Sequence, residues 1–363
     1  MNIKQLGNIG IDYSIPTTPC LLSKDYKIIY RNSSIEIHNP LCYLPVSEEF
    51  QRANENISYY NAILKDRHYR SIELIGDYRQ DNLGNLYFSR RIKGAGKYGS
   101  PNLNKKHCFQ NIKNNETGLV LGLLDEETAE RNYTLTSILH KHGVETEIPE
   151  YTYEIDEIFF QQENGDIAIL PLKEAFECAN IPQEKRKQKY VVQVDGLGTN
   201  FRLQDIMSSS LLFNDSYKNA SIDVASTILL DVIKFLNKEF QIKNTTKKNI
   251  IENFDDYILT FLNRLIENVA RLHNLGGIHN RLTAHNIGMD GRLIDVDSIT
   301  GIIEIKDPKY NLSQTEELSM LEGTISSYLM YMAKTFFPSQ YELKFNIWRD
   351  YYNSNKFKNI KFI

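Results

Sequence analysis

The sequence predicts an α+β fold with a small β-rich first part and a larger helical second part. Between residues 71 and 170, short segments alternate apolar and polar side chains, which is the period of a half-buried strand. Beyond residue 194 the apolar residues mostly recur at helical spacing instead. With 363 residues, 41% of them hydrophobic, the chain can form one large two-part domain or two ordinary ones.

Composition excludes several classes of protein. A net charge of −4 gives no electrostatic footprint for nucleic acid or an anionic membrane. The four cysteines form no CxxC pair, and no apolar run approaches the ~20 residues of a membrane span. We therefore expect a cytoplasmic protein that binds neither nucleic acid nor a membrane. We also expect a monomer, although the sequence itself leaves the oligomeric state open. The richness in Ile, Asn, Lys and Tyr suggests a bacterial source.

The first third of the chain is expected to form an extension and the beginning of a sheet. Residues 1–65 are interpreted as an irregular N-terminal extension that packs on the rest, although 47–64 could form a helix. Strands are predicted at 71–75 and 85–92, joined by a turn at 81–84. The polar segment 105–117 is expected to be a surface insertion.

The middle of the chain predicts one helix followed by strands. Residues 123–142 have acidic groups in the first turn and Lys and His in the last, as a helix dipole favours. Strands are predicted at 151–155, 166–170 and 190–194, with an exposed charged linker at 183–189. The two parts, 66–180 and 181–363, should therefore meet near 171–190.

The second part is predicted to be mainly helical. Amphipathic helices are expected at 225–240, 254–275 and 313–335. The helix at 254–275 leads directly into a loop of polar residues.

That loop and the hairpin after it have the pattern of a metal site. Asn286 follows His279 by seven residues, and Asp295 follows nine residues later, after a turn at 289–291. Carboxylate and amide oxygens are ligands that Mg²⁺ accepts together with phosphates. We therefore predict that Asn286 and Asp295 hold magnesium, with Asp297 as a rival ligand.

The same spacing is that of a protein-kinase catalytic loop and its metal strand, which predicts a bilobal kinase-like fold. Arg281 stands where a kinase keeps its catalytic Asp, so the usual base is missing. His285 is the candidate base, with a surface loop histidine as the alternative. His279 is expected to be structural and to hydrogen-bond the backbone near the metal strand.

Lys93, at the end of the predicted strand 85–92, is the candidate for holding phosphates. A carboxylate of the helix at 123–142 should pair with it. Glu127 and Glu130 qualify and we favour Glu130, although either can be a solvated charge in the first turns. Gly76 lies between two strands upstream of Lys93, where a phosphate-covering loop would be.

These segments together resemble the selenoprotein O family over roughly residues 70 to 300. The family's Gly-Asp-Gly-Arg loop corresponds to Gly76-Asp77-Tyr78-Arg79, and its Leu-Lys-Gly-Ala-Gly to Ile92-Lys93-Gly94-Ala95-Gly96. Its His-Gly-x-x-Asn…Asn loop and Ile-Asp-Tyr-Gly strand correspond to 279–286 and 294–297.

The resemblance implies a kinase-fold protein adenylyltransferase that binds ATP and magnesium and transfers AMP to a protein or peptide hydroxyl. Ligands of ATP would be Gly76, Asp77, Arg79, Lys93, Gly94, Gly96 and Arg202. The family uses two phosphate-binding arginines, but only Arg202 fits here, because the other position falls on Gln193 or Asp195. His285 replaces the family's presumed base.

These departures indicate a divergent member with a specialised substrate such as a peptide or a host protein, in which case it could be a secreted effector acting in a host cytosol. Two alternatives stay open. One is an ordinary kinase, against which Arg281 argues. The other is a pseudoenzyme that binds a partner protein without turnover, which the missing arginine favours.

Overall fold

The computed structural model describes residues 17–23, 26–37, 40, 42–63, 71–96, 112–114, 120–162, 164–199, 201–207, 221–243, 250–303 and 311–360. The strands in this part of the chain are β1 (Thr17–Ser23), β2 (Ile28–Arg31), β3 (Cys42–Pro45), β4 (Tyr59–Ile63), β5 (Ser71–Gln80), β6 (Leu86–Lys93), β7 (Lys113–Asn114), β8 (Val120–Leu121), β9 (Leu124–Asp125), β10 (Ile148–Glu154), β11 (Glu157–Gln161), β12 (Ile167–Pro171) and β13 (Tyr190–Leu197). The helices are α2 (Glu48–Ala53), α3 (Glu126–Lys141), α4 (Leu172–Cys178), α5 (Gln183–Arg186), α6 (Leu203–Met207), α8 (Ser221–Ile242), α9 (Phe254–Asn274), α10 (Gln314–Phe336) and α11 (Tyr341–Asn355), with short 3-10 turns η3 (Val296–Ser298) and η4 (Pro338–Gln340).

A nine-stranded antiparallel sheet forms the first part of the molecule. Its order is β2-β10-β13-β6-β5-β4-β1-β3, and β9 pairs with the start of β13. The central strands β6 and β13 are buried along most or all of their length. This burial explains why charged side chains on these two strands must find partners within the protein.

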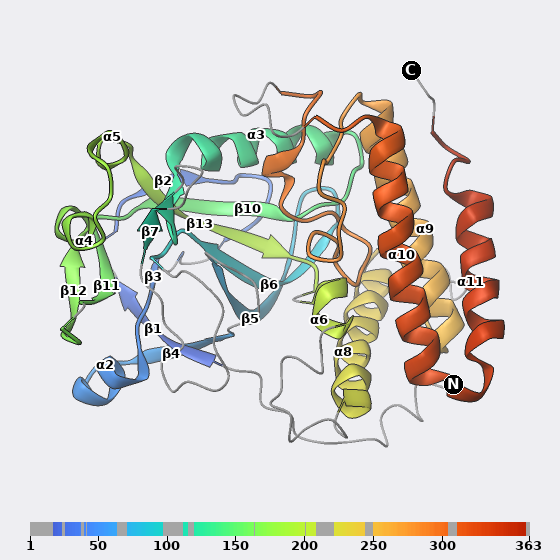
Figure 1. Ribbon diagram of the computed structural model, residues 1–363, viewed down its shortest axis with the longest axis horizontal. Helices are drawn as coiled ribbons and strands as arrows, with labels where there is room; N and C mark the ends of the chain where they lie inside the picture. The colour runs from blue at the N-terminus through green and yellow to red at the C-terminus, as the bar shows by residue number, and fades with distance from the viewer. Residues whose placement is uncertain are drawn as a thin grey trace.

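Helix α3 lies along one face of the sheet (Figure 1). Its Asn132 donates a hydrogen bond to Gln193 of β13. Asp125 caps the start of α3 by accepting from the backbone N–H of Thr128. Gly143, with a φ of 76°, follows its C-terminal end. A separate hairpin of β11 and β12 precedes α4 at the edge of the sheet region.

The second part is helical, with α9, α10 and α11 packed beside one another at the far end of the molecule (Figure 1). Capping boxes begin α9, at Asn253 and Asp256, and α10, at Ser313 and Glu316. An apolar core built mainly from α8 to α11 stands apart from a second core under the sheet. None of the described helices has the length and apolar character needed to cross a bilayer.

The mixed α and β character and the order of its two parts are confirmed. The strands expected at 71–75, 85–92, 151–155, 166–170 and 190–194 exist as β5, β6, β10, β12 and β13. The helices expected at 123–142, 225–240, 254–275 and 313–335 exist as α3, α8, α9 and α10. Most of the expected insertion at 105–117 lies outside the described residues.

Two local predictions were wrong. The possible helix at 47–64 ends at Ala53, and Tyr59–Ile63 forms β4 instead, because it pairs with β1 through Tyr60 and Cys20. The described parts of 1–65 are also less irregular than expected, since β1, β3 and β4 belong to the main sheet. The charged linker at 183–189 contains the single turn α5.

Candidate functional site

The loop after α9 is held in place by buried polar contacts. His279 shares a 2.9 Å hydrogen bond through Nε2 with the backbone oxygen of Ile294, the residue before Asp295. The carboxylate of Glu317, on α10, accepts from the backbone N–H groups of His279 and Asn280. The hydrogen bond predicted between His279 and the backbone near Asp295 is therefore confirmed.

Asn286 and Asp295 stand side by side at the ends of the hairpin. The backbone N–H of Ile294 donates to the oxygen of Asn286 at 2.9 Å. The Asn286 side chain donates through Nδ2 to the backbone oxygen of Arg281 at 3.0 Å, so the Oδ1 end of the amide points away from that carbonyl. Asp295 has a φ of 59° and a ψ of 55°, a left-handed conformation that costs a non-glycine residue about 1–2 kcal/mol and often marks a functional position.

Lys93 reaches Asp295 from the end of β6. Its Nζ lies 2.7 Å from Asp295 Oδ1 and 3.8 Å from Glu147 Oε1. Glu130, the partner expected from the sequence, is instead exposed on α3. The prediction was wrong in choosing the helix, because the contacting carboxylate comes from Glu147, just before β10.

Two arginines complete the cluster around Asp295. Arg91, two residues before Lys93 on β6, places Nη1 2.9 Å from Asp295 Oδ1. Its Nη2 lies 2.9 Å from Asp195 on β13 and also contacts Glu147. Arg202 Nη1 lies 3.7 Å from Asp295 Oδ2 and donates to the backbone oxygen of His285 at 2.8 Å.

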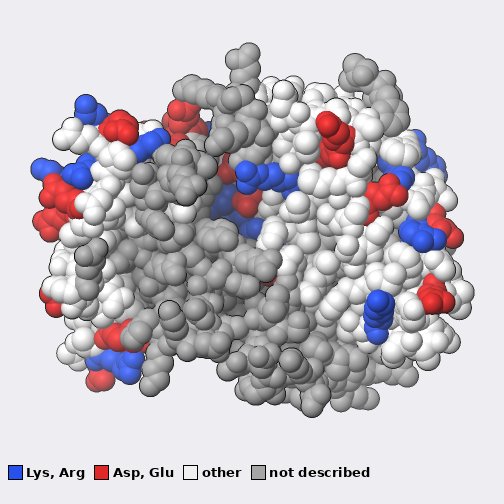
Figure 2. All heavy atoms as spheres, viewed as in Figure 1, with Lys and Arg blue, Asp and Glu red and all other residues white. Residues whose placement is uncertain are grey.

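Three cations therefore converge on one carboxylate. Asp295 is also the open member of the cluster, with 32% of its side chain exposed, while Glu147 has 0%. In Figure 2, basic and acidic side chains lie together in a depression near the centre of the face shown. A ligand that approaches the cluster would meet Asp295 first.

The electrostatics keep Lys93 and Asp295 charged. Burial raises the pKa of Asp295, but Lys93, Arg91 and Arg202 outweigh it and hold that pKa well below its ordinary value. Burial and Arg91 lower the pKa of Lys93, but Asp295 and Glu147 outweigh both and raise it. Asp195 differs, because burial raises its pKa to about 6 despite the nearby Arg91 guanidinium.

Two of the glycines predicted to bind ATP, Gly94 and Gly96, have structural roles of their own. Gly94 has a φ of 87°, and a Cβ there would lie 2.6 Å from both Leu124 Cβ and the Val191 oxygen. Gly96 has a φ of 80° and packs against Ile158, so the fold already requires both glycines. Gly76 lies in β5 with no such restriction.

Arg79 does not join the Lys93 cluster. Its Nε lies 2.6 Å from Glu150, a carboxylate shared with Arg90. Because neighbouring strand residues point to opposite faces, Arg90 and its partners lie across the sheet from Arg91. Asp77 is also in β5, but the structure describes only its backbone and not its side chain.

Asn286 and Asp295 are of the residue types that hold magnesium when it is bound together with phosphate. No group of three or more His, Cys, Asp or Glu side chains gathers as a metal site in the described part of the chain. Mg²⁺ bound with nucleotide needs only one or two protein oxygens, which Asn286 and Asp295 offer. The buried Nε of Arg202 lacks a hydrogen-bond partner among the described residues, which suits an anion beside it.

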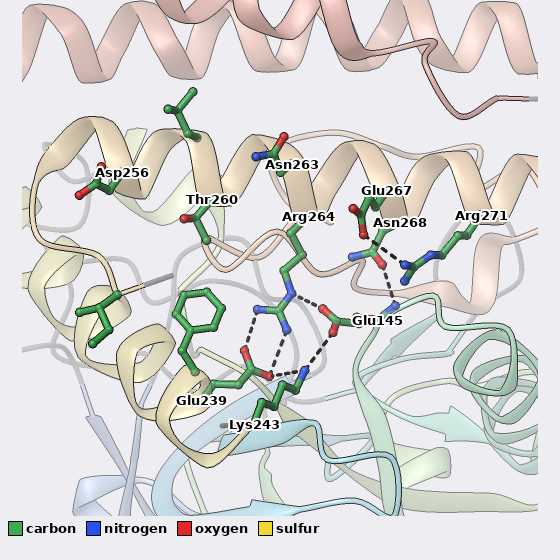
Figure 3. A pocket seen from close by; sticks show the side chains of 13 residues that line it. Glu145, Glu239, Lys243, Asp256, Thr260, Asn263, Arg264, Glu267, Asn268 and Arg271 are labelled. Atoms are coloured by element: carbon green, nitrogen blue, oxygen red, sulfur yellow. Dashed lines mark hydrogen bonds and ion pairs between the residues drawn. The ribbon is translucent and has the colours of Figure 1, made fainter. Parts of the chain in front are cut away.

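A second charged cluster lies behind the hairpin, where sequence reasoning expected nothing. Figure 3 shows Glu145, Glu239, Lys243 and Arg264 pointing toward one another beside a pocket of about 550 Å³. Arg264 makes a bidentate contact with Glu239, in which Nη1 donates to Oε2 at 2.8 Å and Nη2 donates to Oε1 at 3.1 Å.

The same Glu239 also binds Arg292 of the hairpin at 2.6 Å. Arg292 in turn donates to the Leu86 oxygen at the start of β6. The second cluster thus ties α8, α9, the hairpin and the sheet together.

Sequence reasoning missed Arg91, Glu147 and Asp195. One signal was available, because a residue two places before Lys93 on the same strand points to the same face of the sheet. Charged residues at 91 and 195 that sit next to apolar residues, Ile92 and Val194, were the other sign that a buried ionic cluster forms there.

Comparison with known proteins adds no family. No family model matches the chain, and no curated protein matches it either. The likeness to selenoprotein O therefore rests on the motifs alone.

Proposed function

We propose that this protein is an ATP- and magnesium-dependent nucleotidyltransferase that transfers AMP to a hydroxyl of a protein or peptide, on a two-lobed kinase-like fold. The observation that carries the proposal is the meeting of Lys93 with Asp295 next to Asn286. The Lys93 Nζ lies 2.7 Å from an Asp295 oxygen although the two residues are 202 positions apart. A cation for phosphates and two oxygen ligands for magnesium thus stand together.

The backbone of the site supports the same conclusion. Asn286 Nδ2 is fixed on the Arg281 oxygen, which leaves Oδ1 as the end of the amide suited to a cation. Asp295 adopts its left-handed conformation while His279 holds the carbonyl before it. Strain kept at one residue by surrounding contacts is typical of functional positions.

In the proposed reaction, the acceptor hydroxyl oxygen attacks the α-phosphorus of ATP. The new P–O bond forms as the bond to the β-phosphate bridging oxygen breaks, and pyrophosphate leaves. Bound magnesium would offset charge on the phosphate oxygens. Lys93 and Arg202 would stabilise the same charge from the protein side.

A base must take the proton of the attacking hydroxyl. Arg281, at the usual position of a kinase base, cannot do so, because its guanidinium stays protonated. His285 is the proposed base, since Arg202, a member of the cluster, donates to its backbone oxygen and its side chain is half-buried.

The test uses ATP labelled at either the α- or the γ-phosphate, with magnesium and purified protein. Label incorporated into protein from the α position, and lost in Asp295→Ala, supports AMP transfer. Asp231→Ala is the control, because it removes a surface carboxylate that pairs with Lys234 outside the site, and it should retain transfer. Asp297→Ala tests the rival metal ligand, and loss of transfer in it would show that both carboxylates are needed. Incorporation only from the γ position would replace the proposal with a kinase.

The second candidate is a partner-binding pseudoenzyme without turnover. It is favoured by Gln193, whose neutral amide is engaged by Asn132 and the Ala129 oxygen and adds no charge for a phosphate. Magnesium-dependent ATP binding with no incorporation from either label, even with lysate as acceptor, would select this candidate.

A further inference from the structure

The cluster around Asp295 contains one more cation than Lys93 and Arg202. Arg91 is 1% exposed and contacts three carboxylates, those of Glu147, Asp195 and Asp295. Glu147 and Asp195 are each fully buried, whereas Asp295 is the open one. Two buried carboxylates, Glu147 and Asp195, therefore hold the guanidinium on its interior side. Only Nη1 points toward the partly exposed Asp295.

This geometry orients Arg91 towards any group bound beside Asp295. The Nε and Nη2 atoms are both used on Asp195, and Nη2 also on Glu147. The Nη1 atom is the part that can transfer from Asp295 to another anion without disturbing the contacts behind it. A planar guanidinium fixed in this way suits phosphate oxygens.

We infer that Arg91 is a phosphate-binding residue, and that its Nη1 edge passes from Asp295 to a phosphate oxygen when nucleotide binds. This inference rests on the proposed ATP-binding function. It also explains the acidic residue on β13. Asp195 lies directly opposite Arg91 in the β6–β13 pairing and holds its guanidinium in place. The positive charge that the missing arginine would have supplied from β13 is therefore supplied by Arg91 from β6.

If ATP and magnesium bind beside Asp295, its carboxylate would exchange Arg91 and Lys93 for the metal. The two cations would then bind phosphate oxygens instead. Each buried charge keeps a partner throughout, which avoids the large cost of a lone buried ion.

The test compares Arg91→Lys with Arg90→Lys, its neighbour on β6. Both arginines pair with a fully buried carboxylate, but Arg90 points to the opposite face and pairs with Glu150 at 2.8 Å. Binding of ATP with magnesium is measured by calorimetry, and binding of adenosine by displacement of a fluorescent ATP analogue. Melting temperatures report whether each variant folds.

We expect Arg91→Lys to bind ATP about 10- to 100-fold more weakly, as loss of one or two charged hydrogen bonds produces. Adenosine affinity should not change, and Arg90→Lys should match the unaltered protein with both ligands. The double variant Arg91→Gln/Asp195→Asn removes the opposite charges together. It should fold and show at least the same loss for ATP.

Three results would overturn the inference, and they point to different causes. Unchanged ATP affinity in Arg91→Lys removes Arg91 from the phosphate site but leaves the proposed function standing. Equal losses for ATP and adenosine make Arg91 a purely structural residue. An unaltered protein that binds no ATP at all removes the proposed function, and this inference with it.

Discussion

Replacing Glu239 with Gln should destabilise the protein by about 3 kcal/mol at neutral pH. The side chain is 1% exposed and contacts Arg264, Arg292 and Lys243. The change leaves two buried arginines short of a partner, and breaking a buried ion pair in this way costs about 3–5 kcal/mol.

The titration of Glu239 gives a similar magnitude. Burial raises its pKa, but Arg264 and Arg292 outweigh burial and lower it from 4.5 to about 2. This difference corresponds to about 3 kcal/mol of stability. Because the folded-state pKa is the depressed one, the contribution is complete above pH 4.5 and is lost as the pH falls towards 2.

Urea unfolding at several pH values measures this effect, with Asp231→Asn as the control on the same helix. Asp231 pairs with Lys234 on the surface, where both side chains are about half exposed or more, so its loss should cost less than about 0.5 kcal/mol. The difference in free energy of unfolding between Glu239→Gln and the unaltered protein should become smaller below pH 4.5. A loss at pH 7 as small as that of the control would refute the claim that this buried cluster stabilises the fold.

Three further predictions concern other positions. Gly94→Ala should lower the free energy of unfolding by more than about 2 kcal/mol, because a Cβ there would lie 2.6 Å from the Val191 oxygen, whereas Gly165→Ala, at a similar φ with nothing within 4 Å, should cost only about 1 kcal/mol; equal losses in urea unfolding would contradict this. Iodoacetamide should modify the exposed Cys178 in the native protein before the buried Cys20 and Cys42, because burial raises the pKa of the Cys42 thiol to about 11 and that of Cys20 further still. Peptide mass spectrometry measures the order of modification, and earlier labelling of Cys20 or Cys42 would contradict the prediction. Glu317→Gln should cost about 2 kcal/mol, since this buried carboxylate accepts from His273 and from two backbone N–H groups of the catalytic-loop candidate, and an unchanged melting temperature would show that the loop does not depend on it.

Periodicity predicted the regular elements because most of them have one buried face. Helices α9 and α10 have apolar stripes and capping boxes, so local sequence is enough to place them. The segment around Tyr59–Ile63 shows the limit of that reasoning. Its aromatic residues pair with β1, which lies some forty residues earlier, and this long-range pairing overrides a local helical pattern.

The site was predictable where the motif itself fixes the contacts. His279, Asn286 and Asp295 lie within seventeen residues, and the hairpin between them determines how they meet. The carboxylate beside Lys93 was not predictable in the same way. The kinase pattern pointed to a carboxylate of the following helix, Glu127 or Glu130. Glu147 instead follows the end of α3 and reaches Lys93 only because β10 pairs with β13, which in turn pairs with β6.

The hairpin of residues 287–295 connects the two charged clusters. At its turn, Arg292 binds Glu239 and the Leu86 oxygen, and at its end Asp295 binds Arg91 and Lys93 of β6. Both ends of β6 are thus tied to the hairpin by charged groups. Any movement of the sheet relative to the hairpin would have to separate these buried pairs, at a cost of several kcal/mol unless a ligand replaces the lost partners. A polyanion with its metal would supply both kinds of partner at Asp295, so the proposed nucleotide binding would loosen the Asp295 end and leave the Arg292 end intact.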